Sequence, residues 1–207
     1  MQSRIAAIIL SSFAYAAAAQ VGTSTGLLDA NSATETELRA VPNVDAALAA
    51  KIVTSRPIAG ASAFHELLAA SLGDAQREQL YGRLFVTINL NTAARAEILL
   101  IPGMSERMAH EFEEYRPYTS LEQFRREIGK YVPPAEVARL EQYVFVPMNL
   151  NNASGAAFLT IPGMTQRMVH EFEEYRPYTS FEQFRREIGK YVDQKEVARF
   201  ERYLVIE

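Results

Sequence analysis

The sequence contains no cysteine, and this absence excludes several kinds of chemistry. Such a chain has no disulfide bond, no thiolate metal ligand and no attachment point for a lipoprotein anchor. It has only three histidines. Met104, Met108 and His110 come closest to a metal set, but the two methionines share the helical phase of Phe112, which is typical of a core face. We therefore predict no metal site and no cofactor.

Signatures of catalysis are also missing. The chain has no glycine-rich nucleotide loop and no recognisable set of nucleophile, base and orienting group. Adjacent acids such as Glu113 and Glu114 do not face each other on a helix, so they do not form a carboxylate pair. The sequence thus predicts a binding module that is not an enzyme and has no small-molecule substrate.

An excess of basic residues is lacking as well. The chain has 21 Lys and Arg against 25 Asp and Glu, a formal net charge of −4. Loss of Arg4 with a cleaved leader would make the remainder one charge more negative. Bulk attraction to nucleic acid or to anionic lipid is therefore not expected.

Only the N-terminus has a long apolar run. Arg4 precedes apolar residues from Ile5 to Ala16, and three further alanines end at Ala19. This pattern is typical of a secretory signal peptide over residues 1–19, cut near Ala19. A membrane anchor is the alternative, but a spanning helix needs about 20 apolar residues, more than this run provides. We expect a periplasmic or secreted protein with no membrane span after signal removal.

What the sequence does contain is a repeat with a period of 60 residues. Residues 88–147 and 148–207 align without a gap and are identical at 40 of 60 positions. A more divergent copy occupies about 27–87, with the same spacing of its Arg-Pro and proline landmarks. Units this short rarely carry a large core alone, so neighbouring copies are expected to pack on one another. We predict three tandem, all-α units.

Each unit has the pattern of several short helices. In the second unit, Pro102-Gly103 should end one helix, and a second should run from about Glu106 to Tyr115. Asn91 or Thr92 is the expected cap of the first helix, and Ser32 with Glu35 a capping box in the first unit. Later helices should bury these two sets of residues: Phe124, Ile128 and Tyr131, and then Val137, Leu140 and Val144. Short extended pieces are expected at 84–90 and 143–150.

The order of these motifs resembles a known family. Asn89 to Ala93, Ile101 to Met104, Tyr115-Arg116 and Tyr118 to Ser120 resemble the helix-hairpin-helix domain of ComEA-type competence DNA receptors. The resemblance implies three helix-hairpin-helix, SAM-domain-like units. The same fold is also similar to that of an extrinsic photosystem II subunit with an assembly role, so fold alone does not assign the function.

The hairpins depart from the family's DNA-binding pattern. The resemblance implies Gly-hydrophobic-Gly, whose backbone N–H groups approach a phosphate at a helix N-terminus. This chain instead has Asn43-Val44-Asp45, Gly103-Met104-Ser105 and Gly163-Met164-Thr165. Asp45 would repel a phosphate, whereas a Ser or Thr hydroxyl can donate to one.

Two functions remain open from the sequence. One is a periplasmic scaffold or accessory subunit that binds another protein, and the acidic balance favours it. Its docking candidates are Arg116, Tyr118, Arg176 and Tyr178. The other is sequence-nonspecific binding to the backbone of double-stranded DNA. Its candidate residues are Gly103, Ser105, Arg107, Gly163, Thr165 and Arg167. The basic residues of the later helices alternate with acids, which is typical of a solvated face.

Overall fold

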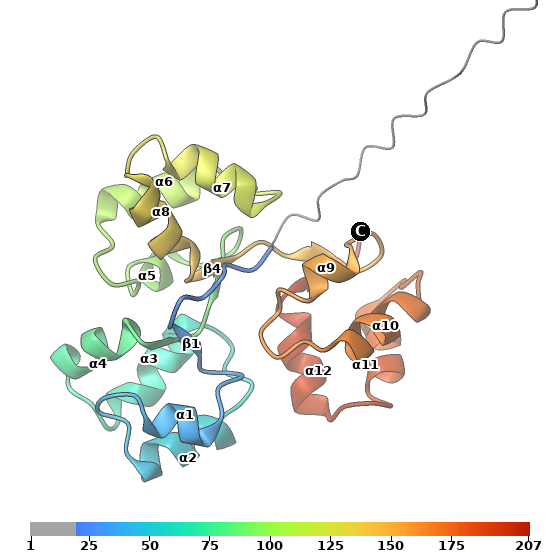
Figure 1. Cartoon of the computed structure of the whole chain (residues 1–207), viewed down its shortest axis with the longest axis horizontal. Helices are drawn as coiled ribbons and strands as arrows, with labels where there is room; N and C mark the ends of the chain where they lie inside the picture. The colour runs from blue at the N-terminus through green and yellow to red at the C-terminus, as the bar shows by residue number, and fades with distance from the viewer. Residues whose placement is uncertain (1–19) are drawn as a thin grey trace, which may run out of the picture.

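The computed structural model describes residues 20–207, so the predicted signal peptide lies outside the described residues. The described part is mostly helical, as the sequence predicts, with six strands of two residues each (Figure 1). The strands fall within the two predicted extended pieces and at the ends of the chain's repeats. Three groups of helices surround the region where the strands lie (Figure 1).

The same order of elements, one strand, four helices and one strand, occurs three times. Segment 1 contains β1 (Leu28–Asp29), α1 (Glu35–Arg39), α2 (Ala46–Thr54), α3 (Ala61–Ala69), α4 (Asp74–Tyr81) and β2 (Leu84–Phe85). Segment 2 contains β3 (Ile88–Asn89), α5 (Arg95–Ile98), α6 (Glu106–Glu114), α7 (Leu121–Ile128), α8 (Pro134–Glu141) and β4 (Val144–Phe145). Segment 3 contains β5 (Met148–Asn149), α9 (Gly155–Phe158), α10 (Gln166–Glu174), α11 (Phe181–Ile188), α12 (Gln194–Glu201) and β6 (Leu204–Val205).

Parallel strand pairs close each segment on itself. β1 pairs with β2, β3 with β4 and β5 with β6, so the first and last elements of every segment lie side by side. Parallel strands need a crossover, and the four helices supply it. Val21 adds an antiparallel bridge to Phe145, which attaches the N-terminal stretch to segment 2.

Local capping chemistry sets where the helices begin. The capping box of α1 is Thr34 with Glu37, not the predicted Ser32 with Glu35. α5 begins after Ala94, which gives no side-chain cap, so the predicted cap at Asn91 or Thr92 is wrong. The Asn91 side chain instead binds the backbone of Tyr118, 27 residues away. This tertiary contact uses the polar atoms that the local rule assigned to a cap.

The predicted core faces are largely correct. Phe112, Phe124 and Ile128 are fully buried. Val137, Leu140 and Val144 of the next predicted face are buried as well. Tyr131 is the exception, because its ring is exposed and its hydroxyl lies 2.7 Å from that of Tyr115.

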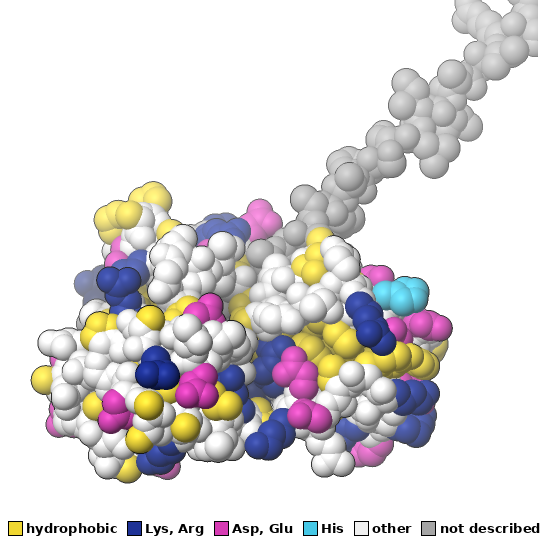
Figure 2. All heavy atoms as spheres, turned by 60° about the horizontal axis from the view of Figure 1, so that its bottom comes forward, with side chains coloured by type: hydrophobic (Ala, Val, Ile, Leu, Met, Phe, Trp, Pro, Cys, Tyr) yellow, Lys and Arg dark blue, Asp and Glu magenta, His cyan; other side chains and the backbone are white. Residues whose placement is uncertain are grey.

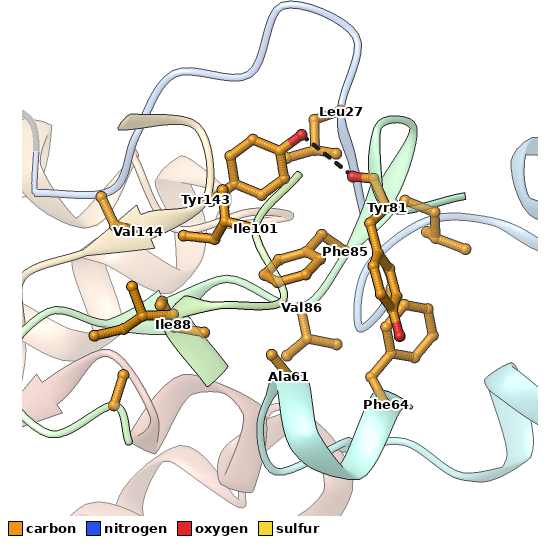
Figure 3. Close-up of a cluster of buried hydrophobic side chains, with 14 of the residues drawn as sticks. Leu27, Ala61, Phe64, Tyr81, Phe85, Val86, Ile88, Ile101, Tyr143 and Val144 are labelled. Carbon is orange, nitrogen blue, oxygen red and sulfur yellow. Dashed lines mark hydrogen bonds between the residues drawn. The ribbon is translucent and has the colours of Figure 1, made fainter. Parts of the chain in front are cut away.

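Segments 1 and 2 share one continuous hydrophobic core, whereas segment 3 has a second one. Figure 3 shows the joint between the first two segments, where the rings of Tyr81, Phe85 and Tyr143 meet. The Tyr143 hydroxyl donates to the Tyr81 carbonyl oxygen at 3.2 Å. Segments 1 and 2 therefore pack on one another, as expected for units too short to bury a large core alone.

Polar groups connect segment 3 to segment 1 and to the linker that follows it. Arg202 donates to the carbonyl oxygens of Ala59 and Thr87 at 3.2 and 2.9 Å. The hydroxyls of Thr87 and Tyr203 lie 3.2 Å apart and are buried. These bonds hold two segments that lie far apart in the chain. Within residues 20–207, no helix is long and apolar enough to cross a membrane.

Candidate nucleic-acid interface

The turns that lead into α2, α6 and α10 each have a residue with left-handed backbone conformation at the same position. Gly103 and Gly163 have φ values of 74° and 75°, and Asn43 occupies the same position in segment 1 with φ of 69°. A residue with a Cβ is strained in this region, and glycine and asparagine tolerate it best. The first residue of each hairpin is thus dictated by the turn, and each turn leads directly into α2, α6 or α10.

The first turns of α6 and α10 present free backbone donors. The Ser105 hydroxyl oxygen accepts the Met108 amide at 3.2 Å, and the Thr165 hydroxyl oxygen accepts the Met168 amide at 3.3 Å. Among residues 20–207, no group accepts a hydrogen bond from the amides of the first two residues of either helix. These donors and the helix dipole favour an anion at both helix N-termini.

Arg107 and Arg167 extend from these two helix starts. Both side chains are exposed, and neither forms an ion pair with any residue in the described range 20–207. The Arg167 guanidinium lies 5.9 Å from the centre of the Tyr191 ring. Segment 1 has Ala47 at the equivalent position. The predicted DNA-contact residues Gly103, Ser105, Arg107, Gly163, Thr165 and Arg167 are therefore brought together as two sets of three.

Segment 1 does not repeat this arrangement. The Asp45 carboxylate caps α2 by accepting the Leu48 amide at 2.8 Å. Its negative charge lies where an anion would bind in the other two segments, and no arginine follows it. Capping stabilises the helix but disfavours a bound phosphate.

The other basic residues of segments 2 and 3 are mostly neutralised within the protein. Arg125 forms two bonds with Glu141, at 2.5 and 2.7 Å, and Arg185 binds Glu201 in the same way. Glu127 is shared by Lys130 and Arg126, whose hydrogen bonds hold the pKa of that carboxyl below its usual range. These helices present mostly ion-paired faces, which leaves Arg107, Arg167 and Lys195 as exposed cations of segments 2 and 3 that form no ion pair within residues 20–207.

The four docking candidates lie in the fold's interior or brace it. Tyr118 and Tyr178 are each only 2% exposed, so their rings are core residues and cannot anchor a partner. Burial raises the pKa of both phenols well above their usual value. The prediction that these tyrosines form an aromatic docking patch is wrong. The proline and threonine beside each tyrosine gave no sign in the sequence that its ring is buried.

Arg116 and Arg176 have a structural task as well. Arg116 donates to the carbonyl oxygens of Leu90 and Ala93, at 2.6 and 2.7 Å. Arg176 and Arg56 repeat this clamp in segments 3 and 1. A paired asparagine, Asn91 in segment 2, holds the neighbouring loop. The threefold spacing of these Arg and Asn residues was the sequence signal for this clamp.

The two hairpins have different neighbours, despite their similar sequences. Gly103 lines a cavity of about 330 Å³ against α4, together with Asp74 and Glu78. Gly163 lines a cleft of about 580 Å³ between segments 1 and 3, with Arg56 and Lys195 among its walls. No cluster of acidic and histidine side chains suited to a metal ion is found among residues 20–207.

Comparison with known proteins gives one partial similarity. The chain is 26% identical over 118 residues to the endonuclease/exonuclease/phosphatase family domain-containing protein 1 of Xenopus laevis. The match covers 43% of this chain but only 21% of that protein, so the chain spans about a fifth of its relative's length. No family model matches the chain, and no solved structure matches it.

This similarity corrects one expectation from the sequence. The prediction that the chain is not an enzyme is contradicted, because the similar protein is named for an endonuclease/exonuclease/phosphatase family domain. This relationship is a low overall identity over 118 residues and not a recognisable set of catalytic side chains, so no single motif of the sequence indicates it.

Proposed function

We propose that this protein binds the sugar-phosphate backbone of double-stranded DNA, without sequence preference, through the starts of α6 and α10. The observation that carries the proposal is a pair of equivalent sites. Each has a left-handed glycine, together with first-turn amides and an exposed arginine that have no hydrogen-bond acceptor or ion pair, respectively, among residues 20–207. Backbone donors and arginines at helix N-termini are the groups that position phosphates in protein–DNA complexes.

In this proposal each segment is a helix-hairpin-helix unit, of which the second and third bind phosphate. Two supports are the helix–turn–helix order in each segment and the left-handed residue in each turn. The partial similarity to a protein named for endonuclease, exonuclease and phosphatase chemistry also favours phosphate esters as ligands. The predicted leader at 1–19 makes the periplasm or the exterior the proposed compartment.

The test is a DNA titration followed by fluorescence anisotropy. A labelled duplex of arbitrary sequence is titrated with the purified protein at several salt concentrations, the lowest about 50 mM. We expect binding that weakens as salt rises, because phosphate contacts release counterions. Incubation of the same duplex with magnesium, followed by gel analysis, tests whether the protein also cleaves it.

Paired substitutions make the first prediction specific. Arg107→Ala with Arg167→Ala should weaken binding and reduce the slope of log affinity against log salt by about 2, since each lost phosphate contact removes about 0.9. Arg39→Ala is the matched control, because Arg39 is also exposed but lies in α1 of segment 1. Equal losses in the control and the double variant, or no salt-dependent binding in the parent protein, would refute the proposal.

A protein-binding scaffold is the second candidate function. The observation in its favour is the acidic balance together with the extensive pairing of cations inside segments 2 and 3. Since Tyr118 and Tyr178 are buried, such a partner would have to contact other surfaces. This candidate would be favoured if the purified protein captured a specific periplasmic partner and did not bind DNA in the titration.

A further inference from the structure

The cleft between segments 1 and 3 has features of a ligand site in addition to the proposed phosphate contacts of the hairpins. Its volume of about 580 Å³ lies within the range of about 300–1,000 Å³ typical of small-molecule pockets. Figure 2 shows Lys and Arg side chains gathered in the hollow between these two lobes, with acidic side chains beside them. The hairpin glycine of segment 3, Gly163, forms part of the wall.

The charges in the cleft do not cancel. Glu196 is engaged with Arg199, by bonds of 2.7 and 2.6 Å. Asp193 caps α12 by accepting the Glu196 amide and keeps its negative charge in the wall of the cleft. Arg56 and Lys195 bind only carbonyl oxygens, and neither forms an ion pair within residues 20–207. The lining thus has three cations, Arg56, Lys195 and Arg199, against two carboxylates, and the two cations without an ion pair within residues 20–207 come from different segments.

The surroundings of Arg56 make a bound anion favourable. Burial lowers the pKa of this guanidinium, and the neighbouring charge of Arg199 lowers it further, although the carboxylates of Asp29 and Glu196 act in the opposite direction. Desolvation and a like charge both disfavour the cation, and the opposite charge of a bound anion would offset them. Val53, Pro57 and Val192 supply apolar wall for the organic part of a ligand.

We infer that this cleft binds the terminal phosphate of a nucleic-acid strand, with its last nucleotide, while the start of α10 holds the adjoining backbone. The inference rests on the proposed function. A terminal phosphate monoester carries a charge of about −1.5 to −2 at pH 7, whereas an internal diester carries one negative charge. Arg56 and Lys195, which form no ion pair within residues 20–207, suit the more highly charged monoester, and Gly163 joins the cleft to the hairpin.

The equivalent hairpin of segment 2 should not bind a strand end. Its neighbouring cavity contains Asp74 and Glu78, and the only arginine there, Arg77, is buried and already bonded to Asp74 and the Leu72 carbonyl oxygen. The residue equivalent to Lys195 in segment 2 is Ala135. Segments 2 and 3 should thus differ in function, because of both their neighbouring side chains and the difference between Ala135 and Lys195.

The test compares three short labelled duplexes that differ only at one end: one with a 5′-phosphate, one with a 3′-phosphate and one with neither. We expect at least one phosphorylated duplex to bind roughly tenfold more tightly, the gain expected from an added charge-assisted hydrogen bond. Lys195→Ala should abolish this preference and leave the affinity for the unphosphorylated duplex nearly unchanged. The variant should fold, because Lys195 is exposed and segment 2 has alanine there.

Lys51→Ala is the matched control, since Lys51 is exposed and also donates to a carbonyl oxygen, but it lies outside the cleft. It should retain the preference for the terminal phosphate. If the three duplexes bind equally, the inference is wrong and backbone binding stands. If Lys195→Ala keeps the preference, the cleft is not the site. If none of the duplexes binds, the proposed function itself fails.

Discussion

At the scale of single residues, the repeated arginines show how identity between copies can reflect folding and not binding. Arg116 is charged and lies in an identical stretch of segments 2 and 3, so it resembled a docking residue. Its guanidinium instead satisfies two carbonyl oxygens at the start of the segment. A planar group with several donors suits this task, because one side chain reaches two acceptors at once.

We predict that Arg116→Ala destabilises the protein by about 2–3 kcal/mol, because two half-buried carbonyl oxygens lose a charged donor. Arg116→Lys should recover little of this loss, since an ammonium group lacks the fork geometry. Urea unfolding followed by circular dichroism measures the difference. Arg107→Ala is the control and should leave the midpoint unchanged; equal effects of both variants would contradict the clamp.

At the scale of elements, the hairpins depend on one left-handed residue each. Gly103 has φ of 74°, and a Cβ placed there would meet nothing closer than the Arg139 side chain at 3.7 Å. Space is therefore available, and the backbone conformation alone restricts this position. Asn43 shows that segment 1 accommodates asparagine in the same turn.

Gly103→Ala should therefore cost roughly 1–2 kcal/mol, the strain of an L residue in the left-handed region. Gly103→Asn should cost less, since asparagine tolerates this conformation better. Thermal unfolding of the two variants beside the parent protein gives the comparison. An alanine variant as stable as the asparagine variant would show that the turn changes its conformation.

Many of the helices and turns were predictable from the sequence. The helix from Glu106 was placed correctly, because a proline-glycine turn and a regular apolar stripe mark it. The cap at Asn91 was wrong, because its side chain bonds to a loop 27 residues away. Local rules describe neighbours in sequence, and this residue's partner is a neighbour only in space.

At the scale of the whole molecule, the junction of segments 1 and 3 contains a buried tyrosine. Burial, with a smaller effect from the Asp29 charge, raises the pKa of Tyr203 to about 12. Its hydroxyl lies beside Thr87 of the linker between segments 1 and 2. Ionisation of this phenol would place a charge inside the junction.

This shift predicts alkaline weakening of the protein. An unfolded tyrosine ionises near pH 10, so the unfolded state loses its proton first, and the contribution of Tyr203 is present in full below about pH 10 and lost as pH rises toward 12. The loss should be on the order of 2 kcal/mol. Urea unfolding between pH 9 and pH 12, with tyrosinate absorbance, measures it. Tyr203→Phe should reduce this dependence by the share of Tyr203, since the raised pKa values of Tyr118 and Tyr178 remain, and an unchanged slope would contradict the assignment.

The sequence by itself determined the 60-residue period, the mostly helical class and the turns, because these follow from residue spacing, caps and backbone preferences within short stretches. Only the tertiary structure decided which charges remain unpaired and that Tyr118 and Tyr178 are core residues. It also decided that one hairpin borders Asp74 and Glu78 while its near-copy borders a cleft of mixed charge that includes Arg56. The physical reason is that segments 2 and 3 fold by the same local rules but pack against different parts of segment 1.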